Sequence, residues 1–427
     1  MESYHFDKFS ITLDKEGSPE FLKVSYPVRY GRYAEITTPS YIFQLNLNGE
    51  IKYVQGRDHH WPHPAEWLKR TMADDWIYYS AGDYKGIYDL FGEYYFPCLS
   101  YPSNSVMGES PFEDQAIKAA LKAWQDLQRS VEGLLSKSLP QDLRDFLINV
   151  AENDAETLRL RSRKLHDLIG GPVSVLPPDS RHVDYEVIPV IVADGCLYNC
   201  GFCRVKSFQD FSRRSRGNIL EQIKNLKQFY VRDLLNYNAV FLGHHDALGA
   251  GQEILEFAAI EAYERFEFEH SYLRGASLFL FGSVDSLIGS KEGMFETLNK
   301  LPFSTYINIG LESADPDTLA VLQKPVTAEK IRDAFEKMTA INRAYEKIEI
   351  TSNFVFSEDL PLNHFLSFVA LTAGKPGYPC TKGCVYLSPL VNGGPENAML
   401  RRKMLRKFYE LKTRSRLPTF LYLIQRL

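Results

Sequence analysis

The chain has 427 residues, of which 44% are hydrophobic and 24% charged, a composition typical of a globular protein rather than a disordered or fibrous one. Its net charge of -5 gives no general attraction to nucleic acid or to an anionic membrane. The sequence opens with no basic segment followed by an apolar run, and we find no apolar run of about 18 residues. We therefore expect a cytoplasmic protein of two or three domains without a membrane span.

The first 110 residues are rich in aromatic side chains and contain a clear hairpin pattern. Residues 41–47 alternate between apolar and polar side chains, which predicts a β-strand with one buried face. Asn48-Gly49 is typical of a hairpin turn, and residues 51–54 are expected to form the returning strand. We interpret residues 1–110 as an aromatic-rich N-terminal α+β domain.

The next segment has a helical pattern. Residues 114–135 and 142–169 carry apolar side chains at helical spacing, with charged side chains between them. Two glycines and a proline follow residue 169, as is typical after the end of a helix. We expect residues 111–180 to form a helical connector.

From about residue 185 the pattern changes to strands that alternate with helices. Residues 187–193 form a nearly continuous apolar run, as in a strand that is buried on both faces. Alternating strands and helices predict a parallel sheet with its ligand site at the carboxyl ends of the strands, in either a partial barrel or an open doubly wound sheet. We assign residues 181–395 to this core and residues 396–427 to a C-terminal helical tail. The later strands are expected at residues 239–243, 277–281, 306–311, 348–356 and 385–390.

Three of the six cysteines lie in one short motif directly after the first core strand. Cys196, Cys200 and Cys203 are separated by three and then two residues. Thiolates are soft donors that suit iron–sulfur clusters and zinc, and three of them can hold three irons of a cubane while the fourth iron stays open. A structural zinc site is the alternative, but zinc usually takes four ligands in two short pairs, and no second pair or histidine lies at the usual distance.

This motif resembles that of the radical S-adenosylmethionine (SAM) superfamily, in which the cysteine loop follows the first strand of a partial (βα)6 barrel. Phe202 matches the aromatic residue that often precedes the last cysteine. The resemblance covers about residues 185–390 and implies an α/β fold with a partial (βα)6 TIM-like barrel beside the N-terminal α+β domain. It also implies that the three cysteines bind a [4Fe-4S] cluster whose open iron is chelated by SAM. Reductive cleavage of SAM would give a 5'-deoxyadenosyl radical that abstracts hydrogen from a substrate.

The end of the second core strand carries a further match. Gly243-His244-His245-Asp246 stands where the family usually has a Gly-Gly-Glu-like stretch, so the resemblance implies that Asp246 contacts the ammonium group of SAM. The sequence departs from the family by the two histidines, which are either a proton relay or substrate contact, or loop histidines without a chemical role. Ser283, after the third strand, is either a contact to the ribose of SAM or a plain turn residue.

The fourth core strand ends in a second resemblance. Gly-Leu-Glu-Ser-Ala at 310–314 and Lys-Pro-Val-Thr at 324–327 resemble the Gly-x-Glu-Ser-Gly and Lys-Gly-x-Thr segments of one branch of the superfamily. That branch contains the Elongator catalytic subunit, the methylthiotransferases and oxygen-independent coproporphyrinogen oxidase. The resemblance implies that Glu312 faces SAM or the substrate. The alternative for Glu312 is a carboxylate that is satisfied by the N-terminus of a neighbouring helix.

The remaining expectations concern the other cysteines, the tail and the partners. Cys98, Cys380 and Cys384 either contribute to a second cluster or are buried structural residues. The apolar residues 417–427 form either an interfacial helix or a segment that packs against the barrel, and we favour packing. We expect a small-molecule or peptide substrate, an electron donor such as flavodoxin or ferredoxin, and no nucleic acid. A non-catalytic iron–sulfur or zinc binding protein is the alternative function.

Overall fold

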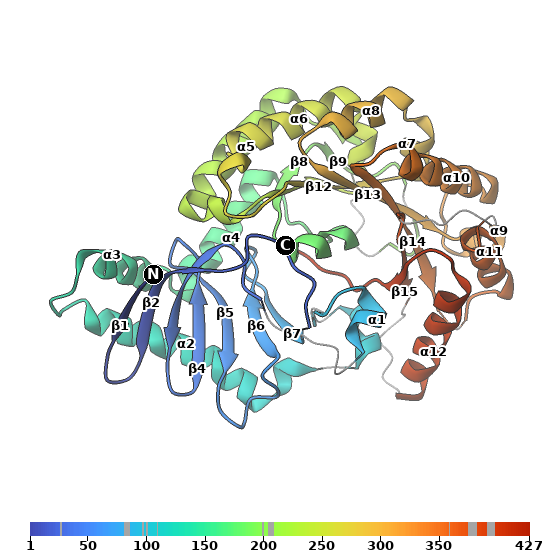
Figure 1. Ribbon diagram of the computed structural model, residues 1–427. Helices are drawn as coiled ribbons and strands as arrows, with labels where there is room; N and C mark the ends of the chain where they lie inside the picture. Colours follow the sequence, from blue (N-terminus) through green and yellow to red (C-terminus); the bar gives the residue numbers. More distant parts are fainter. Residues whose placement is uncertain are drawn as a thin grey trace.

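Two sheets organise the molecule and lie side by side in the computed structural model (Figure 1). The structure describes residues 1–427 except 26–27, 81–85, 96–97, 100, 109, 199, 204–208, 358, 375–381 and 391–397. The first sheet is antiparallel and has seven strands, and the second is parallel and also has seven. None of the helices in the described ranges combines the length and the apolar character needed to cross a membrane.

The N-terminal sheet is a meander in which each strand pairs with the next along the chain. The expected hairpin is confirmed, because residues 41–45 pair in antiparallel register with residues 51–56. Gly49 in its turn has a φ of 78°, a left-handed conformation that favours glycine. The strands are β1 (Glu2–His5), β2 (Ser10–Glu16), β3 (Arg32–Thr37), β4 (Tyr41–Leu45), β5 (Ile51–Gly56), β6 (Glu66–Arg70) and β7 (Trp76–Ser80).

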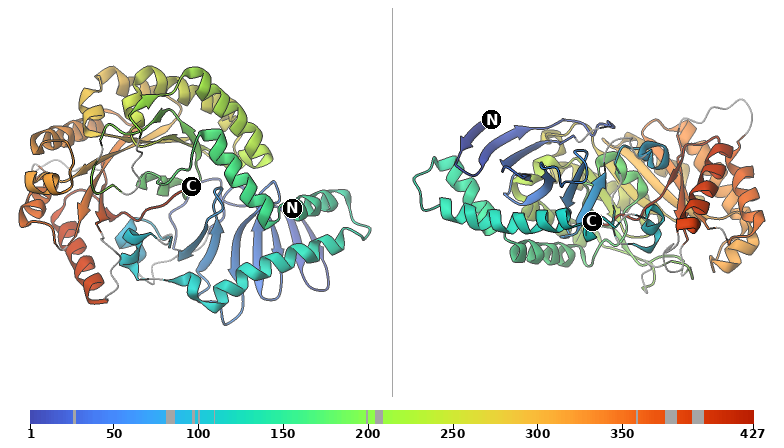
Figure 2. Two further views of the ribbon diagram at one scale, coloured as in Figure 1. Left: turned by 180° about the vertical axis from the view of Figure 1, so that it is seen from behind. Right: turned by 90° about the horizontal axis from the view of Figure 1, so that it is seen from below.

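Helices of the connector cover one face of this sheet (Figure 2). They are α2 (Gln115–Leu134), α3 (Gln141–Glu152) and α4 (Ala155–Ile169). Trp124 of α2 packs on Phe43 of β4, with ring centroids 6.1 Å apart. The helical stretch expected over residues 142–169 is two helices, because Asp154 caps α4 by accepting a hydrogen bond from the Thr157 N–H at 2.7 Å.

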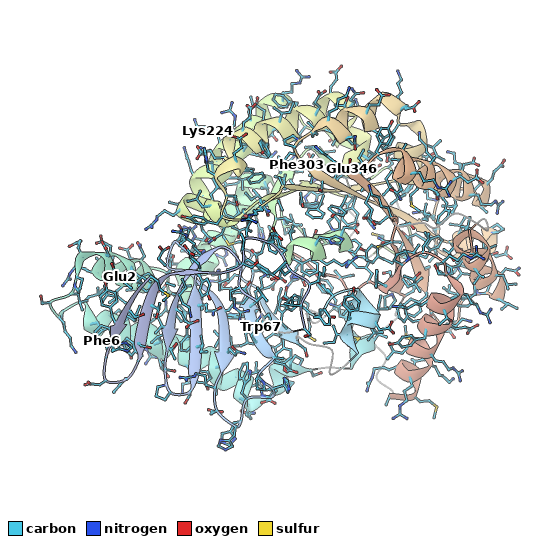
Figure 3. The ribbon with its side chains drawn as sticks, in the orientation of Figure 1. Glu2, Phe6, Trp67, Lys224, Phe303 and Glu346 are labelled. Carbon is cyan, nitrogen blue, oxygen red and sulfur yellow. The ribbon has the colours of Figure 1, made fainter. Side chains whose placement is uncertain are left out.

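The second sheet is the expected parallel core, with strand order β16-β15-β14-β13-β12-β11-β8 and helices along its outer side (Figure 1). Side chains fill the space between the sheet and these helices (Figure 3). Six of the seven strands match the expected positions, and the fold is a partial TIM-like barrel. The strands are β8 (Ile188–Ile191), β11 (Ala239–Gly243), β12 (Ser277–Gly282), β13 (Ser304–Glu312), β14 (Ile348–Phe356), β15 (Val385–Pro389) and β16 (Thr419–Leu421). The helices are α5 (Arg216–Tyr230), α6 (Gln252–Arg265), α7 (Val284–Gly289), α8 (Glu292–Lys300), α9 (Pro316–Val321), α10 (Ala328–Ala344), α11 (Leu362–Thr372) and α12 (Ala398–Arg414).

The seventh strand, β16, comes from the segment that we expected to be a helical tail. The final helix, α12, ends at Arg414, and the chain then returns to the barrel and pairs with β15. Residues 422–427 continue between the two sheets, where the end of the chain lies (Figure 1). The Tyr422 N–H donates to the Leu387 carbonyl at 2.9 Å, and the Gln425 carbonyl accepts from the Leu176 N–H at 2.8 Å. The tail therefore packs against the barrel and does not form an interfacial helix.

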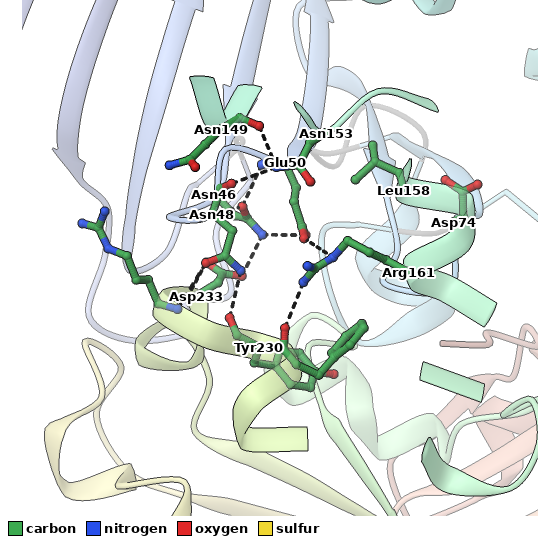
Figure 4. A network of polar contacts seen from close by, with 12 residues as sticks. Asn46, Asn48, Glu50, Asp74, Asn149, Asn153, Leu158, Arg161, Tyr230 and Asp233 are labelled. Atoms are coloured by element: carbon green, nitrogen blue, oxygen red, sulfur yellow. Dashed lines mark hydrogen bonds and ion pairs between the residues drawn. The ribbon is translucent and has the colours of Figure 1, made fainter. Parts of the chain in front are cut away.

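A buried polar network joins the N-terminal sheet to the barrel (Figure 4). The Asn46 amide, at the β4–β5 turn, donates to Asp233 Oδ2 at 3.1 Å. Arg161 of α4 lies 2.6 Å from Glu50 Oε1 and donates to the Phe229 carbonyl at the end of α5. Burial raises the pKa of Asp233 to about 6. The network fixes the antiparallel sheet against the first barrel helix.

Candidate active site

A cavity of about 440 Å³ opens at the carboxyl ends of the barrel strands, where parallel sheets bind their ligands. Its wall combines the cysteine loop, the ends of β12 to β15, and segments from outside the barrel. The lining residues are Tyr101, Val175, Cys196, Tyr198, Cys200, Phe202, Cys203, His245, Phe281, Gly282, Ser283, Gly310, Glu312, Lys324, Asn353, Val355, Ser388, Pro389, Leu390, Tyr422 and Ile424.

The cysteine loop begins and closes with glycines that allow close backbone contact. Gly195 has a φ of 73°, and a Cβ there would lie 2.3 Å from the Asp210 carbonyl oxygen. Gly201 donates its N–H to the Leu322 carbonyl at 3.0 Å, and a Cβ there would lie 2.5 Å from Gln323 Oε1. These contacts tie the loop after β8 to the end of α9, across the mouth of the barrel.

The thiols of Cys196, Cys200 and Cys203 all line the cavity. Burial raises the pKa of the first two thiols, and Lys324 acts against this rise. Among the described side chains, no three of His, Cys, Asp or Glu converge so as to hold a single metal ion. A cubane instead presents a separate iron to each thiolate, so three thiols spread along one loop fit a cluster by their chemistry.

Tyr198, between the first two cysteines, anchors the loop to the start of α7. Its hydroxyl donates to Asp285 Oδ2 at 2.7 Å and accepts from the Asp285 N–H at 2.9 Å. Lys330 contacts the other carboxylate oxygen of Asp285. The Lys324 ammonium lies 5.0 Å from the centre of the Tyr198 ring. The position of the loop therefore depends on Tyr198, to which the family resemblance assigns no cofactor contact.

Glu312 and Lys324 form a buried pair of opposite charges on the cavity wall. Glu312 Oε1 and Lys324 Nζ are 3.9 Å apart, and the two residues are 9% and 8% exposed. A bulge between Gly310 and Glu312 places Glu312 at a φ of 65°, and bulges commonly redirect a side chain. A Cβ at Gly310 would lie 2.6 Å from the Glu312 carboxylate, so the glycine makes room for it. Burial raises the pKa of Glu312, and Lys324 opposes that rise.

Ser283 and Asp246 lie together at the ends of β12 and β11, but only Ser283 lines the cavity. Asp246 is buried behind it, and its Oδ1 accepts from the Ser283 N–H at 2.9 Å and from Ser286 Oγ at 2.7 Å. Asp246 Oδ2 is buried without a hydrogen-bond partner among the described residues. The Ser283 hydroxyl caps α7 by accepting from the Ser286 N–H at 3.0 Å.

Other cavity residues were partly visible in the sequence. His245 lines the cavity, and burial lowers the pKa of its imidazole. Burial also lowers the pKa of His244, to about 4, so both imidazoles are neutral at neutral pH. Asn353 also lines the cavity and exchanges amide hydrogen bonds with Asn308 at 2.7 and 3.1 Å. Asn353 is one of four polar residues in the strand at 348–356, so the sequence did not single it out. The apolar character of residues 417–427 predicted that the tail packs against the barrel, but nothing in the sequence indicated that Tyr422 and Ile424 line the cavity.

The remaining cysteines do not line this cavity where the structure describes them. Cys384 is buried, with its sulfur 3.8 Å from Arg181 Nη2, and burial raises its pKa to about 12. Cys98 is buried and donates its N–H to the Tyr78 carbonyl. Cys380 lies outside the described residues. The question of a second cluster on these residues therefore stays open.

Comparison with known proteins identifies the barrel. A family profile described as the radical SAM superfamily matches residues 190–356, which begin inside β8, include the cysteine loop and end with β14. Residues 190–356 carry a radical SAM domain. The profile covers the segment that carries all three cysteines of the motif, together with Glu312 and Lys324.

The individual proteins that the chain resembles are distant from it in sequence. The ribosomal protein uS12 methylthiotransferase RimO of Herpetosiphon aurantiacus is 22% identical over 172 residues, which are 38% of this chain and 33% of the relative. The chain thus matches only a third of that relative's length. Among solved structures, SuiB of Streptococcus suis is similar with a TM-score of 0.38, 12% identity, and coverage of 84% of this chain and 71% of SuiB. Methylornithine synthase (PylB) has a TM-score of 0.34 and 13% identity, with coverage of 69% and 81%.

Proposed function

We propose that the chain is a radical SAM enzyme that holds a [4Fe-4S] cluster on Cys196, Cys200 and Cys203. The observation that carries this proposal is the shared cavity, which is lined both by the three cysteines and by the buried pair of opposite charges, Glu312 and Lys324. When bound there, the cluster supplies the electron that splits SAM into methionine and a 5'-deoxyadenosyl radical, which abstracts hydrogen from the substrate.

The charged pair suits the methionine part of SAM, which carries one ammonium and one carboxylate group. In this proposal the Glu312 carboxylate binds the ammonium group and the Lys324 ammonium binds the carboxylate. Both side chains are already buried and held on the wall, so they need little reorganisation when the ligand binds. Phe202 and Ser283 line the same cavity and are proposed to contact the nucleoside part of SAM.

Asp246 has a different proposed role from the one that the resemblance implies. Its Oδ1 holds the Ser283 N–H and the Ser286 hydroxyl, and its Oδ2 is buried behind the wall. We therefore propose that Asp246 is a positioning residue that sets the place of Ser283. The proposal further includes a small-molecule or peptide substrate, a reductant such as flavodoxin or ferredoxin, and a cytoplasmic location.

The test is product formation from SAM alone. The full chain is reconstituted anaerobically with iron and sulfide, then incubated with dithionite and SAM, and 5'-deoxyadenosine is quantified by mass spectrometry. We expect product from the wild type and from Cys98→Ala, a buried cysteine outside the cavity. Cys196→Ala, Cys200→Ala and Cys203→Ala should each abolish it. Purified protein dominated by zinc, or a reconstituted cluster that yields no 5'-deoxyadenosine, would contradict the proposal.

A further inference from the structure

One part of the cavity wall is apolar, and the tail of the chain contributes to it. We call it the tail wall and define it by six lining residues, Tyr101, Val175, Val355, Leu390, Tyr422 and Ile424. They come from β14, from the end of β15, from the tail after β16, and from two segments that precede the barrel. We propose that the substrate presents a neutral, mainly apolar group to the tail wall, and that Tyr422 and Ile424 determine specificity. This inference rests on the proposed function.

The two tyrosines of the tail wall have their hydroxyl groups bonded to the protein. Tyr422 donates its hydroxyl to the Leu176 carbonyl at 2.8 Å, and Tyr101 donates to the Ser174 carbonyl at 3.2 Å. Both acceptors belong to the backbone of one segment, residues 174–176. The phenolic protons are therefore already used, and the rings are what the tyrosines offer a ligand. The wall behaves as an aromatic and aliphatic surface rather than as a set of donors.

The tail wall is held in place by hydrogen bonds on both sides of Tyr422 and Ile424. The Ile424 N–H donates to Asn104 Oδ1 at 2.8 Å, and its carbonyl accepts from Asn104 Nδ2 at 3.0 Å. Arg426 forms a two-point ion pair with Asp75, in which Nη2 and Oδ1 are 2.6 Å apart. An extended segment fixed in this way is a preorganised surface, so its shape can discriminate between ligands.

The charges on the cavity wall are compensated. Among the described lining residues, the carboxylate and ammonium side chains are those of Glu312 and Lys324, which face one another and are assigned to SAM by the proposed function. The three cysteines of the wall are assigned to the cluster in the same way. Asn353 and Ser388 add hydrogen-bonding groups without charge. A charged substrate group at the tail wall would lose its water without gaining a counter-charge, which is unfavourable. A neutral group with one or two hydrogen-bonding atoms fits this surface.

Three para-substituted toluenes of similar size and different charge test the inference in the full chain. The dissociation constants of p-cresol, 4-methylbenzoate and 4-methylbenzylamine are measured at pH 7 by saturation-transfer NMR titration, which needs no variant. We expect p-cresol to bind at least tenfold more tightly than either charged probe. Equal or tighter binding of a charged probe would overturn the inference.

A variant then places the binding at the tail. Ile424→Asp should weaken p-cresol binding at least tenfold, whereas Leu160→Asp, at a position that is 51% exposed on α4, should leave it unchanged. Wild-type affinity in Ile424→Asp would overturn the role of the tail. The outcome is separable from the proposed function: 5'-deoxyadenosine formation without probe discrimination refutes this inference alone. Selective p-cresol binding without SAM cleavage refutes the proposed function and leaves the neutral wall standing.

Discussion

Lys324→Met provides a quantitative test of the charged pair in the cavity. Removing one partner of a fully buried ion pair typically costs about 3–5 kcal/mol, because the other charge is left without compensation. In this protein the charged atoms are 3.9 Å apart, beyond hydrogen-bond distance, and the cavity beside them can admit water. We therefore expect Lys324→Met to lower the free energy of unfolding by about 2–3 kcal/mol, below that range.

The double variant separates the effect of charge from that of packing. Adding Glu312→Gln to Lys324→Met removes the uncompensated carboxylate and should recover all but about 1 kcal/mol. Lys330→Met is the matched control, since its pair with Asp285 is half-exposed and should contribute less than about 1 kcal/mol. Urea unfolding monitored by circular dichroism gives the values for the wild type, the single variants Lys324→Met and Glu312→Gln, the double variant and the control. Additive costs in the double variant would refute the coupling of Glu312 and Lys324.

Three further predictions concern other buried contacts. Burial raises the pKa of Asp179 from 3.8 to about 6, so its contribution to stability is complete at low pH and is lost as the pH rises through 6. Asp179→Asn should therefore flatten the dependence of the unfolding free energy on pH between about 4 and 7. An unchanged slope would contradict this. Tyr198→Phe removes two hydrogen bonds to Asp285 and should lower the free energy of unfolding by about 1–2 kcal/mol. It should also reduce the amount of iron bound after reconstitution, which a colorimetric iron assay measures. Full iron loading would refute the anchoring role. Asn104→Ala should speed deuterium uptake at Ile424 in hydrogen-exchange mass spectrometry while the antiparallel sheet stays protected, and unchanged uptake there would show that the tail is held by other contacts.

The barrel could be predicted because its strands are buried on both faces. The apolar run at residues 187–193 contains β8, and similar runs contain β11 and most of β12. β13 and β14 carry several polar residues, and their positions were indicated by the alternation with helical stretches. The hairpin around Asn48-Gly49 was visible for a different reason, since Gly49 in its turn has a positive φ that favours glycine. In both cases the pattern is local, so a short stretch of sequence contains the information.

The strand β16 and the hydrogen bonds of Asp246 could not be predicted, because both depend on contacts between distant segments. β16 is only three residues long and is defined by its pairing with β15, which periodicity does not reveal. Ile424 reaches the cavity because Asn104, 320 residues away in the sequence, holds its backbone. Asp246 occupies the expected strand end, yet the Ser283 N–H and the Ser286 hydroxyl take up its Oδ1. A motif identifies the strand end but not the hydrogen bonds that its side chain makes there.

The central claim is that three thiols hold a four-iron cluster with one iron left for SAM. Electron paramagnetic resonance of the dithionite-reduced protein, recorded before and after SAM is added, tests it most directly. We expect the signal of a reduced [4Fe-4S] cluster that changes when SAM binds, and that disappears in Cys200→Ala. A spectrum without a four-iron cluster, or one that SAM leaves unchanged, would contradict the claim.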